Sequence, residues 1–264
     1  MFKKIRLSIL LLLLAAVALD SWLDKSRARD WERTLRVVLY PINGDGSEAA
    51  ARHIASLRRD DFLPIEDFFR HQGQAHGLAL RTPVDIQLAD EIDSRPPPLP
   101  REAGTLAIMA WSLQMRYWAF RVDEYDGPAP EVRLFLLYFD PRQNERLAHS
   151  VGMEEGLLGI VNVFAGRRHR GRNNVVITHE LLHTVGARDK YDPRTNLPLF
   201  PAGYAEPRRT PLYPQPRAEI MGGRIPLSAQ RAVIPGSLEL TMIGPATARE
   251  IGWPGSDQKT AFND

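Results

Sequence analysis

The sequence feature that most constrains this chain is the run His179-Glu180-Leu181-Leu182-His183, in which two histidines stand four residues apart. On an α-helix with about 3.6 residues per turn, positions i and i+4 project from the same face, so both imidazoles can reach one metal ion. Glu180 points about 100° around such a helix, outside the coordination sphere but close enough to take a proton from a water molecule at the metal. The run therefore predicts a helix that carries a hydrolytic zinc site.

The residues around this run favour a buried helix that ends soon after His183. Apolar side chains recur through it, at Val175, Ile177, Leu181, Leu182 and Val185. Asn173 and Asn174 are typical of residues that cap a helix start. Gly186 allows the chain to leave the helix in a left-handed conformation, and that turn would bring Asp189 back towards the metal. Asp189 is therefore the candidate third ligand; the alternative carboxylates are Asp192, Glu206 and Glu219.

From His179 to Asp189 the sequence resembles the metzincin zinc peptidases. Their extended motif is His-Glu-x-x-His-x-x-Gly-x-x-His, with Asp at the last position in some members. Metzincins also carry, some tens of residues downstream, a tight turn that holds a methionine beneath the zinc ligands, and residues 218–223, with Met221, look like this Met-turn. Residues 238–253 resemble the closing helix of the same fold. The likeness in motifs covers residues 157–253, and the upstream half is assigned only by analogy.

The resemblance implies an α/β zincin-like fold in two lobes. The upper lobe, residues 34–186, would hold a twisted mixed sheet over the active-site helix. The smaller lower lobe, residues 187–264, would hold the third ligand, the Met-turn and the closing helix. In the resembling fold the strand before the active-site helix, here residues 157–165, lies at the sheet edge and pairs with an extended substrate.

Local sequence patterns predict the remaining elements of the upper lobe. Alternating or continuous apolar runs indicate strands over residues 35–42, 84–88 and 131–139. Helices are expected over residues 47–57, with Ser47 as the cap, and over residues 60–76. The apolar run 106–120 is ambiguous between strand and helix, and its length favours a helix.

The implied function is that of an exported zinc-dependent metalloendopeptidase acting on a peptide or protein. Zn²⁺ would be held by His179, His183 and Asp189, and Glu180 would be the general base. One alternative is a zinc peptidase of another His-Glu-x-x-His group, with a downstream ligand such as Glu206 or Glu219. The other is a non-catalytic, zinc-stabilised exported binding protein.

One departure from the metzincin pattern leaves the stabiliser of the oxyanion unassigned. Several metzincins have a tyrosine two residues after the Met-turn methionine that helps at the metal, whereas this chain has Gly223 there. The connecting segment offers three other phenols, those of Tyr191, Tyr204 and Tyr213. The alternative to a role at the metal is that these tyrosines simply pack on the surface of a proline-rich loop.

The N-terminus predicts export. Lys3, Lys4 and Arg6 precede an apolar run of 13 residues, 7–19. This is shorter than the roughly 20 residues that span a bilayer, which favours a signal peptide cleaved near Ala18; an uncleaved membrane anchor is the alternative. Residues 20–33 would then form a stalk. Either way the domain is expected outside the cytoplasm, as a periplasmic or cell-surface protein, secreted or anchored through its N-terminus.

Composition narrows the classes of partner. The chain has 34 basic and 32 acidic residues, and three of the basic ones lie in the leader, which leaves 31 against 32 in the remainder. This near-neutral balance gives no support for nucleic-acid binding. The basic run at residues 167–172 is either a solvated loop or a patch for acidic substrates or lipid headgroups. Cysteine is absent, which excludes disulfides and thiolate zinc ligands.

Overall fold

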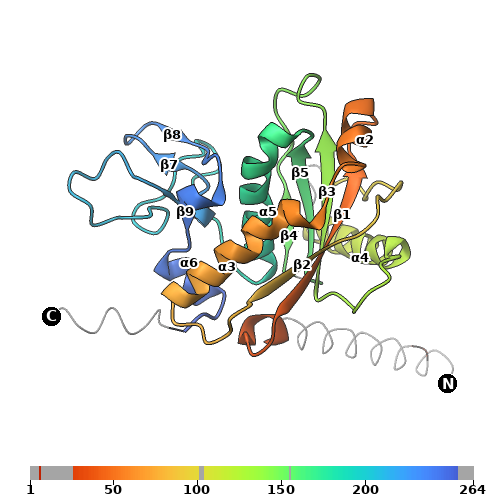
Figure 1. The fold of residues 1–264 in the computed structure, drawn as a ribbon, viewed down its shortest axis with the longest axis horizontal. Helices are drawn as coiled ribbons and strands as arrows, with labels where there is room; N and C mark the ends of the chain where they lie inside the picture. Colours follow the sequence, from red (N-terminus) through yellow and green to blue (C-terminus); the bar gives the residue numbers. More distant parts are fainter. Residues whose placement is uncertain (1–5, 7–25, 101–103, 155, 255–264) are drawn as a thin grey trace.

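The computed structural model describes residues 6, 26–100, 104–154 and 156–254, and it centres on a five-stranded mixed sheet in the order β2-β1-β3-β5-β4 (Figure 1). The strands are β1 (Leu35–Asn43), β2 (Val84–Leu88), β3 (Val132–Phe139), β4 (Val151–Met153) and β5 (Leu158–Phe164). Four of them run parallel, and β4 runs antiparallel to β5. The expected α/β class with a mixed sheet is confirmed.

Helices cover both faces of this sheet. They are α2 (Glu48–Ile54), α3 (Leu63–Ala75), α4 (Thr105–Val122), α5 (Arg170–Thr184) and, beyond the sheet, α6 (Pro245–Glu250). Val37 and Leu39 of β1 face the core formed with α3 and α5, whereas Val38 and Tyr40 face a second core formed with α4. Burial on both faces explains why β1 reads as a continuous apolar run and not as an alternating one.

The expected strands 35–42, 84–88 and 131–139 and helices 47–57, 60–76 and 106–120 are all present, with ends that differ by a few residues. Ser47 caps α2, because its hydroxyl accepts a hydrogen bond of 3.1 Å from the Ala50 amide. The ambiguous apolar run is the helix α4.

The strand before the active-site helix is not at the sheet edge, which corrects the expectation for residues 157–165. Strand β5 pairs with β3 on one side and with β4 on the other. The edge is β4, a strand of three residues that follows the chain's turn through residues 140–150. So short a segment, with Gly152 at its centre, carries no readable strand pattern.

The described part of the expected stalk, residues 26–33, packs against the domain. Ala28 and Trp31 are buried, and the Trp31 indole donates a hydrogen bond of 2.6 Å to the Ile251 carbonyl. The Trp31 ring also lies against Phe69 and Trp253. These residues are therefore not a free linker. The leader expected over residues 1–19 lies outside the described residues apart from Arg6, and no helix in the described part has the length and hydropathy needed to cross a membrane.

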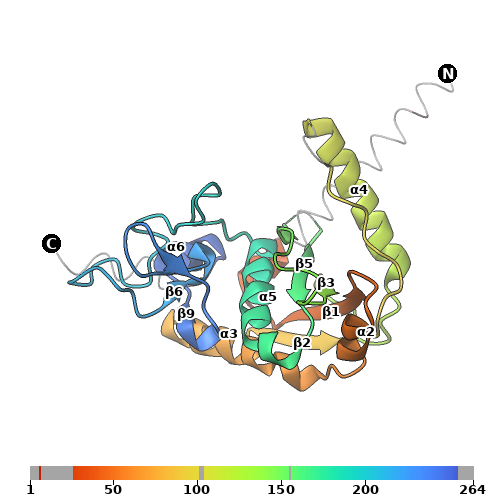
Figure 2. The same ribbon diagram turned by 90° about the horizontal axis from the view of Figure 1, so that it is seen from above.

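The C-terminal part, from residue 187, lies beside α5 on the side away from the sheet (Figures 1 and 2). It is mostly loops, with two short strand pairs: β6 (Ala218–Glu219) with β9 (Thr241–Met242), and β7 (Ile225–Pro226) with β8 (Ala232–Val233). The closing helix expected over residues 238–253 is shorter than predicted. A single 3₁₀ turn, Leu238–Leu240, and β9 come first, and α6 begins only at Pro245, where proline suits the first helical turn.

Candidate metal centre

Helix α5, which carries both histidines, is anchored at its start by two asparagines that the sequence suggested as caps. It begins at Arg170, so Asn173 and Asn174 lie inside its first turns and are not caps. Asn173 instead donates a hydrogen bond of 2.8 Å to the Phe164 carbonyl, and Asn174 donates one of 3.0 Å to the Asp61 carbonyl. Arg170 pairs with Asp61 at 2.9 Å. The two asparagines therefore fasten the helix to β5 and to the turn before α3.

Both histidines are held in one tautomer by the backbone. His179 Nδ1 lies 2.9 Å from the Ile220 carbonyl, and His183 Nδ1 lies 2.8 Å from the Ala187 carbonyl. A carbonyl oxygen can only accept, so each Nδ1 carries the proton. In the neutral rings the lone pairs then lie on the two Nε2 atoms, which are 3.2 Å apart. This is the arrangement that prepares two imidazoles for a common cation.

The turn after α5 brings Asp189 to the histidines, as the sequence predicted. Gly186 has φ of +97°, and the Ala187 amide donates to the Leu182 carbonyl at 3.0 Å, which closes the helix end. Asp189 Oδ1 lies 3.1 Å from His179 Nε2 and 3.2 Å from His183 Nε2. The three ligand atoms all lie within 4.8 Å of one another, and among the described residues this is the one such group of three or more metal-binding side chains.

The segment that carries Asp189 is fixed on both sides. The Glu250 carboxylate of α6 accepts hydrogen bonds from the Arg188 amide at 2.9 Å and from the Lys190 ammonium at 2.7 Å. The Lys190 amide donates to the Met221 carbonyl at 2.8 Å. Position 189 is thus held between α6 and the turn that contains Met221.

The electrostatics of the group favour a cation. Burial lowers the pKa of His179, but the hydrogen bond with Asp189 and the charge of Glu180 outweigh it and raise that pKa to about 9. Burial raises the pKa of Asp189, but hydrogen bonds from His179 and His183 more than offset this, so the pKa lies well below its ordinary value. The group of three side chains therefore attracts positive charge. Without a metal ion, the proton on His179 supplies that charge.

Glu180 lies on α5 beside the histidines but outside the group of ligand atoms. It is only 6% exposed, and burial raises the pKa of its carboxyl group despite the nearby histidines. The Gly152 backbone of β4 hydrogen-bonds to it. Burial thus makes the carboxyl group of Glu180 a better proton acceptor than an exposed glutamate.

Met221 is fully buried in a tight turn directly below His179, since the neighbouring Ile220 carbonyl is the partner of that imidazole. Glu219 holds the turn together. Its carboxylate accepts hydrogen bonds from the Gly222 amide at 2.9 Å, from the Gly244 amide at 3.1 Å and from the Thr247 hydroxyl at 2.6 Å. Glu219 is thus engaged in the lower lobe and is not one of the grouped ligands.

The other alternative carboxylates are also engaged elsewhere. Glu206 pairs with Arg209 at 3.3 Å, and Asp192 accepts a hydrogen bond of 2.9 Å from the Arg194 amide in its own turn. Neither belongs to the group around the two histidines. Of the four acids considered from the sequence, only Asp189 lies with His179 and His183.

One of the three candidate phenols lies at the site. The Tyr191 ring centroid is 6.3 Å from that of His179, and burial together with the charge and hydrogen bond of Asp189 raises the pKa of Tyr191 to about 12. Tyr204 and Tyr213 instead hydrogen-bond to each other at 2.7 Å. A Cβ atom on Gly223 would lie 3.9 Å from the Tyr191 ring. Tyr191 therefore borders the position where metzincins carry their tyrosine.

A pocket of about 160 Å³ opens beside His179. Its walls are mainly apolar, with Val176, Ile220 and Ile234, and they also include Tyr191 and Arg224. The proline-rich segment after Tyr191 contributes Asn196. The pocket suits a small or medium apolar side chain.

Gly152 is a site residue that sequence reasoning missed. A Cβ atom there would lie 2.5 Å from the Glu180 carbonyl oxygen and 2.6 Å from His183 Cβ, so only glycine lets β4 approach α5 this closely. The sole sequence signal was a glycine between apolar residues, Val151 and Met153, which is common in loops.

No protein-family model matches the chain, and the comparison with curated proteins found no significant match.

Proposed function

We propose that this protein is a zinc-dependent metallopeptidase with a zincin-like fold of the metzincin type. The observation that carries the proposal is the convergence of His179, His183 and Asp189, with both Nδ1–H groups already donated to backbone carbonyls. Backbone partners of this kind fix the tautomer and ring orientation of metal-binding histidines. Two imidazoles and one carboxylate form a donor set that zinc accepts in hydrolytic sites.

The residues present fit this ion. The group is small, partly buried and negatively biased, and His179 also lines the neighbouring pocket. When bound, zinc would supply a Lewis acid that increases the acidity of a water molecule and polarises the carbonyl of a substrate. Glu180 would remove the proton of that water and later deliver it to the leaving amine.

The Tyr191 hydroxyl is the candidate donor to the oxyanion. It comes from the segment just after Asp189 and not from the Met-turn, where Gly223 leaves room for its ring. With a pKa of about 12 it remains protonated across the physiological range, and the hydroxyl that hydrogen-bonds to Asp189 in this structure would donate to the oxyanion in the transition state.

The substrate would bind as an additional strand along β4. This strand has β5 on one side and, among the described residues, no strand on the other, and its Gly152 lies against Glu180. Edge pairing supplies main-chain hydrogen bonds with little demand on sequence, and the 160 Å³ pocket would take one side chain.

The two alternatives are less well supported. A peptidase with a downstream glutamate ligand would need Glu206 or Glu219 beside the histidines, and both are engaged elsewhere. A non-catalytic zinc protein has no use for a buried carboxyl group with a raised pKa next to its ligands.

The test combines zinc analysis with cleavage of a broad peptide library by the wild type and the Glu180→Gln variant. We expect one zinc per chain in both proteins and a loss of turnover of about 10²–10⁴-fold in the variant, because only the base is removed. Equal cleavage by both proteins would exclude Glu180 as the base. Zinc without any cleavage would favour the binding protein, and no zinc in either would refute the metal site.

The matched variants for the third ligand are Asp189→Asn and Asp192→Asn. Only the first should lower zinc affinity, since Asp192 is engaged in its own turn.

For the oxyanion donor, Tyr191→Phe should reduce kcat with little change in KM or zinc content, because its hydroxyl would act mainly in the transition state.

A further inference from the structure

Helix α4 has an apolar outer face that nothing in the described structure covers. Its inner face, with Trp111, Met115 and Ala119, is buried against the sheet. The outer face carries six large apolar side chains that are 41–81% exposed: Leu106, Ile108, Met109, Leu113, Tyr117 and Phe120. An exposed apolar patch of this extent on a helix is typical of a surface that binds another protein or a membrane.

The first turns of α4 are exposed on every side. Residues 106–110 are all apolar and all exposed, and the burial by the sheet begins only at Trp111. Figure 2 shows α4 standing away from the rest of the domain. One flat partner or one additional helix would cover a single side of this projecting end. A surrounding apolar medium covers all sides, and the acyl region of a lipid bilayer is such a medium.

The charges on α4 fit the surface of a bilayer. The helix contains Arg116 and Arg121 and no acidic residue. Its exposed outer face includes Tyr117, and tyrosine is a residue that gathers at the boundary between headgroups and acyl chains. Long arginine side chains can keep their charge at the headgroups while the apolar neighbours enter the bilayer.

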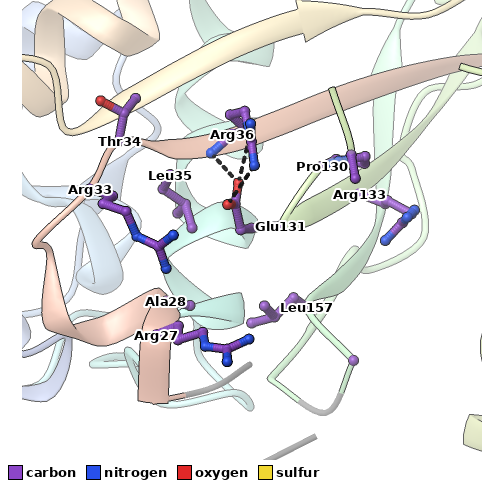
Figure 3. Close-up of a pocket in the computed structure, with 12 residues that line it drawn as sticks. Arg27, Ala28, Arg33, Thr34, Leu35, Arg36, Pro130, Glu131, Arg133 and Leu157 are labelled. Carbon is purple, nitrogen blue, oxygen red and sulfur yellow. Dashed lines mark hydrogen bonds and ion pairs between the residues drawn. The ribbon is translucent and has the colours of Figure 1, made fainter. Parts of the chain in front are cut away.

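A basic pocket adjoins the helix. It is lined by Arg27, Arg33, Arg36 and Arg133 (Figure 3). Arg36 is paired with Glu131 of the same lining at 3.1 Å, and Arg133 is paired with Asp123 at 2.7 Å. Gly156 also lines this pocket, and the position of its Cβ would be 3.2 Å from the Arg116 side chain of α4. An excess of arginine beside the apolar helix favours anionic headgroups.

The described segment that begins at residue 26 lies beside the basic pocket. Arg27 and Ala28 line the basic pocket, eight and nine residues after the end of the apolar run 7–19. Eight extended residues reach at most about 29 Å, so an N-terminal segment in a bilayer would hold this side of the domain close to the membrane. Three features therefore coincide at one side: the apolar helix, the basic pocket and the exit of the N-terminal segment.

We propose that α4 lies in the interface of a lipid bilayer that contains anionic lipids, with residues 106–113 among the acyl chains and Arg116 and Arg121 at the headgroups. This proposal does not depend on the peptidase activity. It gives the domain a fixed orientation on the membrane in place of a loose tether. Interfacial helices of this kind lie about 5–10 Å deep.

The experiment uses the absence of cysteine from the chain. Leu113→Cys in the full chain provides a single site for an environment-sensitive fluorophore, and Leu199→Cys, at a comparably exposed leucine in the C-terminal part, is the matched control. Each labelled protein is mixed with vesicles of equal parts phosphatidylcholine and phosphatidylglycerol. Quenching by brominated acyl chains and by aqueous iodide is then measured. Vesicle binding alone is not the readout, because the N-terminal run could supply it.

We expect brominated lipid to quench the probe at position 113 at least about twofold and to leave the probe at position 199 unchanged. Leu106→Glu in the Leu113→Cys background should abolish this quenching. A probe at position 113 that stays open to iodide on vesicle-bound protein would refute the proposal. Shielding from iodide without vesicles would also refute it, because the N-terminal run or a second copy of the chain would then cover the helix.

Discussion

At the residue scale, the position of Asp189 favours the protonated form of His179. The carboxylate lies within hydrogen-bond distance of the two Nε2 atoms, so in the metal-free protein it stabilises the protonated form of His179. The same carboxylate would serve as a ligand once a metal replaces the proton. A proton and a bound metal would therefore compete for one small group of atoms.

This competition predicts proton release on zinc binding. The pKa of His179 is raised from 6.5 to about 9, so its contribution to stability is complete below pH 6.5 and is lost as the pH rises to 9. Zinc should displace about one proton near pH 7.5 and almost none well above pH 9. Calorimetric titration in two buffers of different ionisation enthalpy measures this number. Identical heats in both buffers at the lower pH would contradict the assignment.

At the element scale, the approach of β4 to α5 couples the sheet edge to Glu180, the proposed general base. Gly152→Ala should separate the two elements, because the new methyl group would meet the Glu180 backbone oxygen, which cannot rotate away. We expect a loss of about 1–3 kcal/mol in the free energy of unfolding and a lower kcat. Urea denaturation and peptide cleavage measure the two effects. Gly236→Ala is the control, since no atom lies within 4 Å of its Cβ position.

A second coupling between elements runs through Arg29. Its guanidinium donates to the Val185 carbonyl at 2.9 Å and to the Glu250 carbonyl at 3.2 Å, and it pairs with Glu154 at 3.2 Å. Arg29→Met should cost about 1–3 kcal/mol of stability, because carbonyls at the end of α5 and α6 lose their donor. Zinc affinity should fall as well, since the turn at Gly186 loosens. Arg33→Met, at an exposed arginine nearby, should change neither quantity in denaturation and zinc titrations.

At the scale of the whole molecule, the ligands come from two regions. The histidines belong to α5, and Asp189 belongs to the segment fixed by α6 and the Met221 turn. Zinc at a hundred times its Kd should add about 2.7 kcal/mol of stability, so a chelator should lower Tm by roughly 5–10 °C. Scanning fluorimetry with and without chelator measures this shift. The Asp189→Asn variant should show a smaller one, and an equal shift in both proteins would argue against Asp189 as a ligand.

The parts of this molecule that sequence predicted are those with strong local signals. The apolar runs of β1, β3 and β5 and the helix spacing of His179 and His183 each depend on neighbours in the chain. Sequence also predicted the turn at Gly186, because a left-handed residue after a helix favours glycine. With that turn, the juxtaposition of Asp189 and the histidines followed from a short stretch of chain.

What sequence did not predict depends on contacts between distant segments. Strand β4 has three residues and exists through its pairing with β5 and its contact with α5. Arg29 and Trp31 lie in a charged stretch that is typical of a linker, and their burial depends on partners more than 150 residues away. The place of Tyr191 beside Gly223 likewise follows from the fold of the proline-rich segment.

The packing of Trp31 against Trp253 has a consequence for how the protein is made. A ribosome releases the chain from its N-terminus, so Trp31 emerges more than two hundred residues before Trp253 and the Ile251 carbonyl that receive it. Arg29 likewise emerges long before Glu250, whose backbone carbonyl accepts its hydrogen bond. The contacts between the two ends of the described domain can therefore form only after the helix that carries the histidines has been synthesised. The hydrogen bonds to Glu250 that fix the segment around Asp189 can therefore form only when synthesis has almost ended.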